Sequence, residues 1–300
     1  MEEWRGGFSR HAPQIDVRWW DDPEVAPEQV EYAVVWDPEP GRLASFPRLK
    51  AIFGSGAGVD HIAKDPLLPA GVPIVRCVPE EATQRMGEFV CWAVLSLAKE
   101  ARRMAIAQAE SRWDGVDPPY AAADRTVGIM GLGAMGERAA VMLRGIGIPV
   151  RGWSRTRKSI AGVESFAGVG EMDAFLAGTE VLVCLLPATP ETEGLLAAPL
   201  FRKLPSGAGL VQVGRGSQQV MPDILAALDS GQLSGAVLDV FSPEPLAASD
   251  PAWAHPGIIV TPHVASLPSR AERARYIAAA IAALNRGETL PHVYDPARGY

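Results

Sequence analysis

The sequence predicts an α/β protein built from two doubly wound parallel-sheet domains, on three observations. The chain has 300 residues, of which 48% are hydrophobic, and this exceeds the usual size of one compact domain. Short apolar runs alternate with stretches of helical period, as in parallel sheets covered by crossover helices. A glycine-rich turn joins one such run to a helix near the middle of the chain.

The first third of the chain contains four apolar runs that we expect to be strands. They span residues 15–19, 32–36, 51–53 and 74–76. From about Met86 the apolar residues fall three and four positions apart, and the pattern continues into the charged stretch 99–103. This spacing predicts one long helix.

A complete doubly wound sheet is expected in the middle of the chain. Six buried-strand runs follow one another with helical segments among them, at residues 126–130, 150–153, 181–185, 210–213, 235–238 and 258–260. A last helix is expected near residues 270–285, because Ile277 and Ile281 share one face and Gly287 follows.

Composition argues against several classes of function. The net charge of −7 and the lack of a basic block disfavour nucleic acid and anionic membranes as partners. Cys77, Cys91 and Cys184 form no CxxC pair, which disfavours disulfides and a metal site and favours the reducing cytoplasm. The first residues lack the pattern of a signal peptide, and no apolar run approaches the length of about 18 residues that a membrane span needs.

The glycine-rich turn has the sequence GLGAMG and lies between a predicted strand and a predicted helix, which is the context of a dinucleotide-binding Rossmann domain. Gly131 permits the tight turn, Gly133 lets a pyrophosphate approach the backbone, and Gly136 lets strand and helix pack closely. Ala134 and Met135 are expected to contact the same ligand at the helix N-terminus. The alternative is a turn without a ligand.

The end of the second strand of this sheet indicates which dinucleotide binds. An NAD enzyme usually presents an acidic side chain here to the ribose 2′-hydroxyl, but residues 153–158 of this chain include no Asp or Glu. It has instead hydroxyl and cationic side chains that suit a 2′-phosphate, namely Trp153 followed by Ser154, Arg155, Thr156, Arg157 and Lys158. We therefore expect NADPH/NADP⁺ as the cofactor in preference to NADH, with a solvated basic turn as the alternative.

Four further segments carry a family resemblance. FGSGAGVDHI at 53–62, VQVGRG at 211–216, LDVFSPEPL at 238–246 and TPHVAS at 261–266 resemble the D-isomer-specific 2-hydroxyacid dehydrogenase family. Its glyoxylate/hydroxypyruvate reductase A group is the most similar, through WSRTRKS, LLPATPET, LAALDSG and the closing ARGY. The resemblance covers essentially the whole chain.

The resemblance implies three catalytic residues. Arg215 would clamp the carboxylate and keto oxygen of the substrate, since a planar guanidinium suits that geometry. His263 would be the general acid that protonates the carbonyl oxygen as hydride arrives. Glu244 would pair with the imidazole and fix its orientation. Taken singly, each could instead be an ordinary turn, loop or core residue.

The resemblance also implies substrate and cofactor contacts. The N–H groups of Gly56, Ala57 and Gly58 would receive the substrate carboxylate, Trp36 would line the substrate pocket, and Ser266 would present a hydroxyl to the substrate. For Trp36, core packing is the alternative. Cofactor contacts would come from Asp239 at the nicotinamide amide, Pro187 and Thr189 along the adenosine side, and Val213.

The chain departs from the family pattern at two kinds of place. Gln212 replaces the usual Asn, and Met221-Pro222 replaces an acidic pair at a helix start. The short first strand of the family is missing, since residues 1–20 resemble the helix and second strand that follow it. We expect a Rossmann domain at residues 92–267 inserted into a smaller flavodoxin-like substrate domain made of residues 1–91 and 268–300.

These observations predict an NADPH-dependent reductase of small 2-keto acids, such as glyoxylate and hydroxypyruvate, to 2-hydroxy acids. A homodimer is expected, because the family embraces a second subunit with the arm at 109–123. Two other functions remain open: a regulator that binds a dinucleotide without turning it over, and a reductase of phosphorylated or larger keto acids.

Overall fold

The structure is a computed structural model that describes residues 2–115 and 121–300. The chain divides into two compact units, Met1–Ala82 with Leu267–Tyr300 and Thr83–Ser266. The sequence placed the first division at residue 91, inside the continuous helix α3 (Glu80–Ala98). Because a continuous helix has one hydrophobic period throughout, its sequence does not mark where one unit ends.

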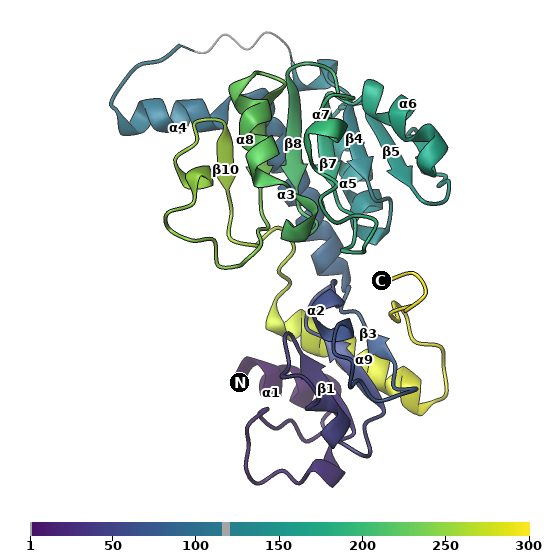
Figure 1. Cartoon of the computed structure of the whole chain (residues 1–300). Helices are drawn as coiled ribbons and strands as arrows, with labels where there is room; N and C mark the ends of the chain where they lie inside the picture. The colour runs from purple at the N-terminus through teal and green to yellow at the C-terminus, as the bar shows by residue number, and fades with distance from the viewer. Residues whose placement is uncertain (1, 116–120) are drawn as a thin grey trace. The chain divides into compact units, whose positions relative to one another are not determined.

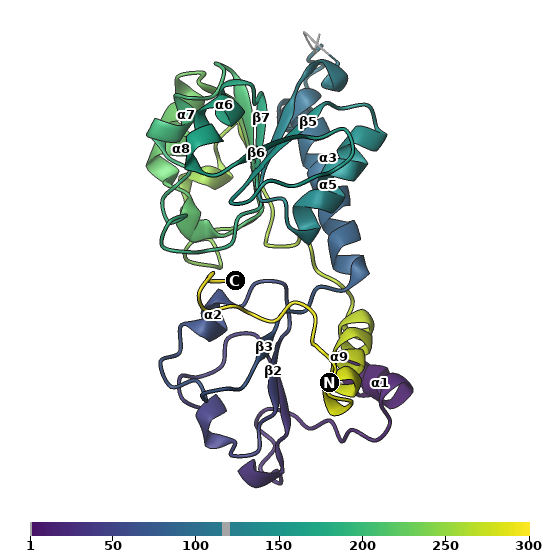
Figure 2. The ribbon, with the colours of Figure 1, turned by 90° about the vertical axis from the view of Figure 1, so that its right-hand side faces the viewer.

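The smaller unit contains a parallel sheet of three strands in the order β1-β2-β3. Its elements are α1 (Glu2–His11), β1 (Tyr32–Val35), β2 (Ala51–Gly54), α2 (Asp60–Ala63), β3 (Ile74–Val75) and α9 (Arg270–Asn285), with short 3₁₀ turns at Pro27–Gln29 and Leu43–Ser45. Helices α1 and α9 cover one face and α2 the other (Figure 2). All four residues of β2 are buried, as in a strand covered on both sides.

The strand predicted at residues 15–19 is not present, and this prediction is wrong. The segment is irregular, although Ile15 and Val17 still pack against the core beside α1 and α9. In a flavodoxin-like sheet the second strand pairs with the first. Among the described residues, the sheet of this unit consists of β1, β2 and β3, and none of them pairs with this segment.

The larger unit contains a seven-stranded parallel sheet in the order β10-β9-β8-β7-β4-β5-β6. The strands are β4 (Val127–Met130), β5 (Val150–Ser154), β6 (Glu164–Ala167), β7 (Val181–Cys184), β8 (Ala208–Gln212), β9 (Leu233–Leu238) and β10 (Ile258–Val260). Six were predicted, and β6 was missed because it is an edge strand without a buried residue. The predicted fold class of parallel α/β sheets is confirmed.

Helices cover both faces of this sheet (Figure 2). They are α3, α5 (Ala134–Gly145), α6 (Met172–Ala177), α7 (Ala198–Phe201) and α8 (Met221–Asp229). Helix α4 (Ala101–Ala109) follows α3 and buries one residue, Ala107, and 3₁₀ turns lie at Ala122–Asp124, Val169–Glu171, Gly216–Gln218 and Pro251–Trp253. One core lies under α3 and α5 and the other under α6, α7 and α8. Figure 1 shows the carboxyl ends of the strands at one edge of the sheet, where parallel sheets of this type bind ligands.

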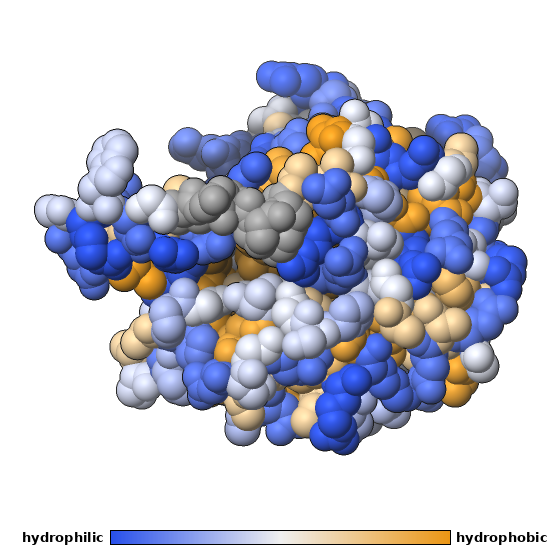
Figure 3. Space-filling view, turned by 90° about the horizontal axis from the view of Figure 1, so that it is seen from above, coloured by the Kyte–Doolittle hydropathy of each residue, from blue (hydrophilic) through white to orange (hydrophobic). Residues whose placement is uncertain are grey.

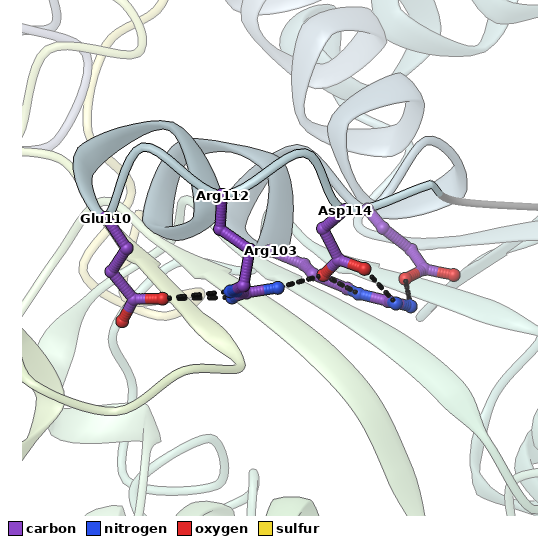
Figure 4. Close-up of polar contacts among 5 residues, drawn as sticks. Arg103, Glu110, Arg112 and Asp114 are labelled. Atoms are coloured by element: carbon purple, nitrogen blue, oxygen red, sulfur yellow. Dashed lines mark hydrogen bonds and ion pairs between the residues drawn. The ribbon is translucent and has the colours of Figure 1, made fainter.

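The helix predicted from about Met86 into residues 99–103 begins earlier, at Glu80, and also ends earlier than predicted. It ends at Ala98, and Glu100, with φ 51°, redirects the chain into α4. The turn after α4 is held by ion pairs in which Arg103 and Arg112 both contact Asp114, at 3.0 and 2.6 Å (Figure 4). Figure 3 shows this region as a projection with a mainly hydrophilic surface in that view. Residues 116–120 of the predicted arm at 109–123 lie outside the described residues.

The described residues contain neither a membrane-spanning helix nor a cluster of metal ligands. No helix there has the length and hydrophobicity that crossing a bilayer requires. Nor do three or more His, Cys, Asp or Glu side chains gather there as a metal site would require.

Candidate active site

The carboxyl ends of β8, β9 and β10 bring three sequence-predicted residues to one edge of the larger sheet. Arg215 follows β8, Glu244 lies in the loop after β9, and His263 follows β10. The strands are direct neighbours in the order β10-β9-β8. Residues distant in sequence therefore reach the same edge because parallel strands all end there.

His263 and Glu244 form a hydrogen-bonded pair. The imidazole Nδ1 lies 2.8 Å from Glu244 Oε2, and each side chain is about one-third exposed. The other carboxylate oxygen, Oε1, accepts the Phe241 N–H at 2.9 Å. The carboxylate thus fixes the ring through one nitrogen, which leaves Nε2 as the position from which the ring could exchange a proton with a substrate.

Asp239 holds the turn that carries His263. Its side chain is 1% exposed and accepts bonds from Thr261 Oγ1 at 2.6 Å and from the N–H groups of Val264 and Ala265 at 2.9 and 3.0 Å. His263 has φ 54°, a conformation that is uncommon for a residue with a side chain. The carboxylate of Asp239 therefore stabilises a turn that would otherwise be unfavourable.

The loop of Arg215 is held by two fully buried glutamines. Gln218 Oε1 accepts the Arg215 N–H at 2.9 Å, while its Nε2 donates to the carbonyls of Leu186 and Pro187 at 3.0 and 2.9 Å. Gln212 donates to the Arg215 carbonyl at 2.9 Å and accepts the Gly214 N–H at 3.1 Å. These bonds fix the backbone from which the guanidinium extends.

Gly216 joins the Arg215 loop to the Glu244 loop. A Cβ at Gly216 would overlap the backbone carbonyl of Phe241, so only glycine permits this contact. Phe241 is also the residue whose N–H binds Glu244. The Arg-Gly pair in the sequence therefore reflects close packing of two neighbouring loops.

The glycine loop has the geometry that its sequence predicted. Gly131, with φ 104°, lies where a Cβ would approach the Leu185 carbonyl to 2.8 Å, and a Cβ at Gly136 would overlap the Gly131 carbonyl. Gly133 is the N-cap of α5 and would meet nothing within 4 Å. Two glycines are thus required by the fold itself, whereas Gly133 leaves open space at a helix N-terminus, where an anion is favoured.

The segment after β5 carries exposed cations with different partners. Arg157 forms an ion pair with Glu171 and donates to the Ser165 carbonyl, so it stabilises the β5–β6 region. A hydrogen bond from Thr189, helped by the charge of Arg155, lowers the pKa of Glu191. Ser154 Oγ donates to the Thr156 carbonyl at 2.7 Å and shapes the turn.

In the smaller unit, the loop of residues 55–58 follows β2. Among the described residues, the N–H groups of Gly56, Ala57 and Gly58 have no hydrogen-bond acceptor. All three residues are half-buried. A Cβ at Gly56 would come within 2.9 Å of Trp36 Cζ3, and the Trp36 ring lies 4.3 Å from that of His61. Consecutive backbone N–H groups without an acceptor in the protein are typical of an anion-binding site.

Comparisons with known proteins identify the family of the chain. Residues 91–265 match the family model of the D-isomer specific 2-hydroxyacid dehydrogenase NAD binding domain. The chain is 41% identical to glyoxylate/hydroxypyruvate reductase A of Serratia proteamaculans, over 100% of this chain and 96% of the relative. The chain belongs to the D-isomer-specific 2-hydroxyacid dehydrogenase family. It is an NAD(P)-dependent oxidoreductase, as predicted.

Solved structures of family members are similar over the full length. A dehydrogenase of this family from Xanthobacter autotrophicus Py2, in complex with NADPH and MES, superimposes with a TM-score of 0.93 at 40% identity, covering 100% of this chain and 96% of that one. The NADPH-dependent glyoxylate/hydroxypyruvate reductase of Sinorhizobium meliloti, in complex with NADP and sulfate, gives 0.91 at 40% identity with the same coverage.

Within this dehydrogenase the other predicted contacts lie in varied environments. Trp153 and Val213 are buried, and the Trp153 indole donates to the Gly168 carbonyl at 2.8 Å. Thr189 and Pro187 lie in a turn after β7 that Thr192 Oγ1 holds together. Ser266 Oγ lies 4.0 Å from Met135 Sδ.

Sequence reasoning missed part of the support for the active site of this dehydrogenase. Gln212 was noted only as a departure from the family pattern, and Gln218 was not singled out, yet both hold the Arg215 loop. Asp239 was expected at the cofactor, and its three bonds to the His263 turn were not foreseen. The sequence did contain one signal, which is a polar residue within an apolar strand: Gln212 lies between Val211 and Val213, and a buried side-chain amide needs hydrogen-bond partners.

Proposed function

We propose that this dehydrogenase reduces small 2-keto acids, with glyoxylate and hydroxypyruvate as the expected substrates, to 2-hydroxy acids with NADPH. The observation that carries the proposal is the 2.8 Å bond between His263 Nδ1 and Glu244 Oε2. A dinucleotide regulator has no use for such a pair, whereas a reductase needs a proton donor beside the carbonyl. The relative from Serratia proteamaculans bears the name of this activity.

The residues of the larger unit suit NADPH. The open space at Gly133 and the N-terminus of α5 would accept the pyrophosphate, and Arg155, with the hydroxyls of Ser154 and Thr156, would accept the 2′-phosphate. When bound, NADPH supplies the hydride that reduces the keto carbon. The solved relatives named above contain NADPH or NADP.

The chemistry assigned to the protein is proton transfer and charge stabilisation. As the keto carbon accepts hydride, its oxygen accepts the proton of His263 Nε2, so the product is the neutral hydroxyl and the imidazole is left without that proton. Glu244 stabilises the protonated ring before transfer. Arg215 would bind the substrate carboxylate and polarise the carbonyl, and the N–H groups of Gly56, Ala57 and Gly58 would bind the carboxylate oxygens.

The experiment is an NADPH oxidation assay over a panel of keto acids. We expect turnover with glyoxylate and hydroxypyruvate and little with phosphorylated or bulky keto acids, because Trp36 closes over Gly56. NADPH binding without oxidation on every keto acid would favour the regulator instead. A preference for a phosphorylated keto acid would keep the chemistry and change the assigned substrate.

We also propose that the protein is a homodimer formed through the larger unit. Large apolar side chains are exposed on α3, α4, the segment after α4 and the 3₁₀ turn at Pro251–Trp253: Trp92, Leu95, Met104, Trp113 and Trp253. Arg102 on α4 donates to the Trp253 carbonyl at 3.2 Å, so α4 and this turn lie side by side. Exposed apolar groups gathered in this way are typical of an interface.

A further inference from the structure

The carbonyl groups of Ser55, Gly56 and Ala57 each accept a hydrogen bond, whereas the N–H groups of Gly56, Ala57 and Gly58 have no acceptor among the described residues. Arg76 Nε donates to the Ala57 carbonyl at 2.7 Å, the Cys77 N–H to the Gly56 carbonyl at 3.0 Å, and Arg273 Nη1 to the Ser55 carbonyl at 3.4 Å. Three consecutive peptide groups are therefore held from the carbonyl side.

Because each peptide group is planar, these three contacts also fix the directions of three N–H groups. In a trans peptide, the carbonyl of one residue and the N–H of the next lie in one plane and point in opposite directions. The carbonyls of Ser55, Gly56 and Ala57 belong to the same peptide groups as the N–H groups of Gly56, Ala57 and Gly58. Each donor thus fixes the direction of one of the three N–H groups that the proposed function assigns to the substrate carboxylate.

The two guanidiniums come from elements packed beside β2. Arg76 directly follows β3, whose Val75 is in register with Phe53 of β2, and its own N–H donates to the His292 carbonyl at 3.0 Å. Arg273 lies in α9, and its Nε donates to the Pro268 carbonyl at 3.0 Å. Both side chains are only half-exposed. Their charges also polarise the peptide groups that they bind, which makes the opposite N–H groups stronger donors.

We propose that Arg76 and Arg273 are positioning residues that orient the N–H groups of the 55–58 loop toward the substrate carboxylate. Arg76 acts on the Gly58 N–H and Arg273 on the Gly56 N–H. The inference rests on the proposed function, in which this loop binds the carboxylate. Neither arginine contacts the substrate in this proposal, so their effect is on affinity for the keto acid and not on affinity for NADPH.

The kinetic test uses Arg76→Met and Arg273→Met, with Arg48→Met as the control. Arg48 is an exposed arginine of the same unit whose partner is Glu31. We expect KM for the keto acid to rise by about 10- to 100-fold in the first two variants, the worth of a hydrogen bond from a charged group, while kcat changes less. Affinity for NADPH and the KM of Arg48→Met should equal those of the parent. Arg76→Lys, which keeps a cationic donor, should recover part of the affinity.

A spectroscopic test separates positioning from general loss of structure. Oxamate, an unreactive keto-acid analogue, is titrated into the NADPH complex while the backbone amide resonances of Gly56, Ala57 and Gly58 are followed by NMR. In the parent all three should shift. Arg76→Met should reduce the shift chiefly at Gly58, and Arg273→Met chiefly at Gly56.

Folded Met variants with the KM and the oxamate shifts of the parent would overturn the inference. A parent that reduces keto acids without shifts at the three amides would overturn it while leaving the reductase intact. A parent that reduces no keto acid would instead contradict the proposed function. If the Met variants do not fold, Arg76→Gln and Arg273→Gln, which remove the charge and shorten the side chain, replace them, and unchanged KM values with unchanged shifts at Gly58 and Gly56 would count against the inference.

Discussion

At the scale of single residues, His263 depends on two carboxylates with different tasks. Glu244 binds the imidazole, and Asp239 binds the backbone of the turn on which the imidazole stands. A left-handed conformation costs a residue with a side chain about 1–2 kcal/mol, and the bonds to Asp239 offset it. The position of the ring is therefore fixed before substrate binds, which is what an efficient proton donor requires.

Replacing His263 tests its assigned role. His263→Ala should lower kcat for keto-acid reduction by about 10²–10⁴-fold, the usual contribution of a positioned general acid, with affinity for NADPH unchanged. Glu244→Gln should give an intermediate kcat, since the amide can still accept the Phe241 N–H but carries no charge. Steady-state kinetics and NADPH binding give both quantities. The exposed His11 supplies the control variant His11→Ala, and near-normal kcat in His263→Ala would mean that another group donates the proton.

The cysteines lead to a prediction about thiol reactivity. All three are free, and burial raises the pKa of Cys77 and of Cys184 to about 12. At pH 8 the thiolate fraction of each is then on the order of 10⁻⁴, so a thiol reagent should scarcely modify them in the folded protein. Burial also raises the pKa of the half-buried Cys91, which should react slowly. Mass spectrometry after labelling should show at most one modified cysteine before denaturation and three after it; rapid labelling of Cys77 would contradict the structure.

At the scale of elements, the strand-to-helix turn before α5 contains glycines with separable tasks. Gly136→Ala should lower the melting temperature strongly, because its Cβ would overlap the Gly131 carbonyl. Gly133→Ala meets open space and should cost about 1 kcal/mol at most, as a change at an N-cap does. It should still raise KM for NADPH by about tenfold or more, because the methyl group occupies the approach of the pyrophosphate. An unchanged KM in Gly133→Ala would argue against this loop as the phosphate site.

The segment after β5 should set the choice of cofactor. We expect kcat/KM to be at least about tenfold higher with NADPH than with NADH, since one charge-assisted contact supplies such a factor. Arg155→Asp should remove the preference by repelling the 2′-phosphate. Arg157→Ala is the matched control: its guanidinium is engaged by Glu171, so the variant should lose stability and keep the preference. Equal kcat/KM with both cofactors in the parent would contradict the assignment of this segment to the 2′-phosphate.

At the scale of the whole molecule, the exposed aromatic residues of the larger unit predict self-association. Light scattering at micromolar concentration should give twice the chain mass of 32.0 kDa. Trp113 is fully exposed, so Trp113→Glu should weaken the dimer without unfolding the chain, whereas Val169→Glu, at a residue that is 89% exposed in another part of the larger unit, should not. A 32.0 kDa particle for the parent would contradict the homodimer.

The sequence alone determined the parts of this protein that depend on local rules. Apolar runs of three to five residues identified six of the seven strands of the larger sheet, because strands buried on both faces leave continuous hydrophobic segments. Gly131 and Gly136 could be assigned to the turn from the glycine spacing, and the structure gives the reason: Gly131 has φ 104°, and a Cβ at Gly136 would overlap the Gly131 carbonyl. Arg215, Glu244 and His263 were found together through short motifs at the ends of neighbouring strands.

Only the tertiary structure decided which residues support those groups. The bonds from Gln218 to Leu186, from Asp239 to Val264 and from Arg273 to Ser55 join segments that are 32, 25 and 218 residues apart. The tertiary structure also decided that the segment 15–19 is not a strand. It has apolar residues at strand spacing, but no described strand pairs with it. A hydrogen-bond partner is fixed by the register and order of distant elements, and no periodicity within a segment records that information.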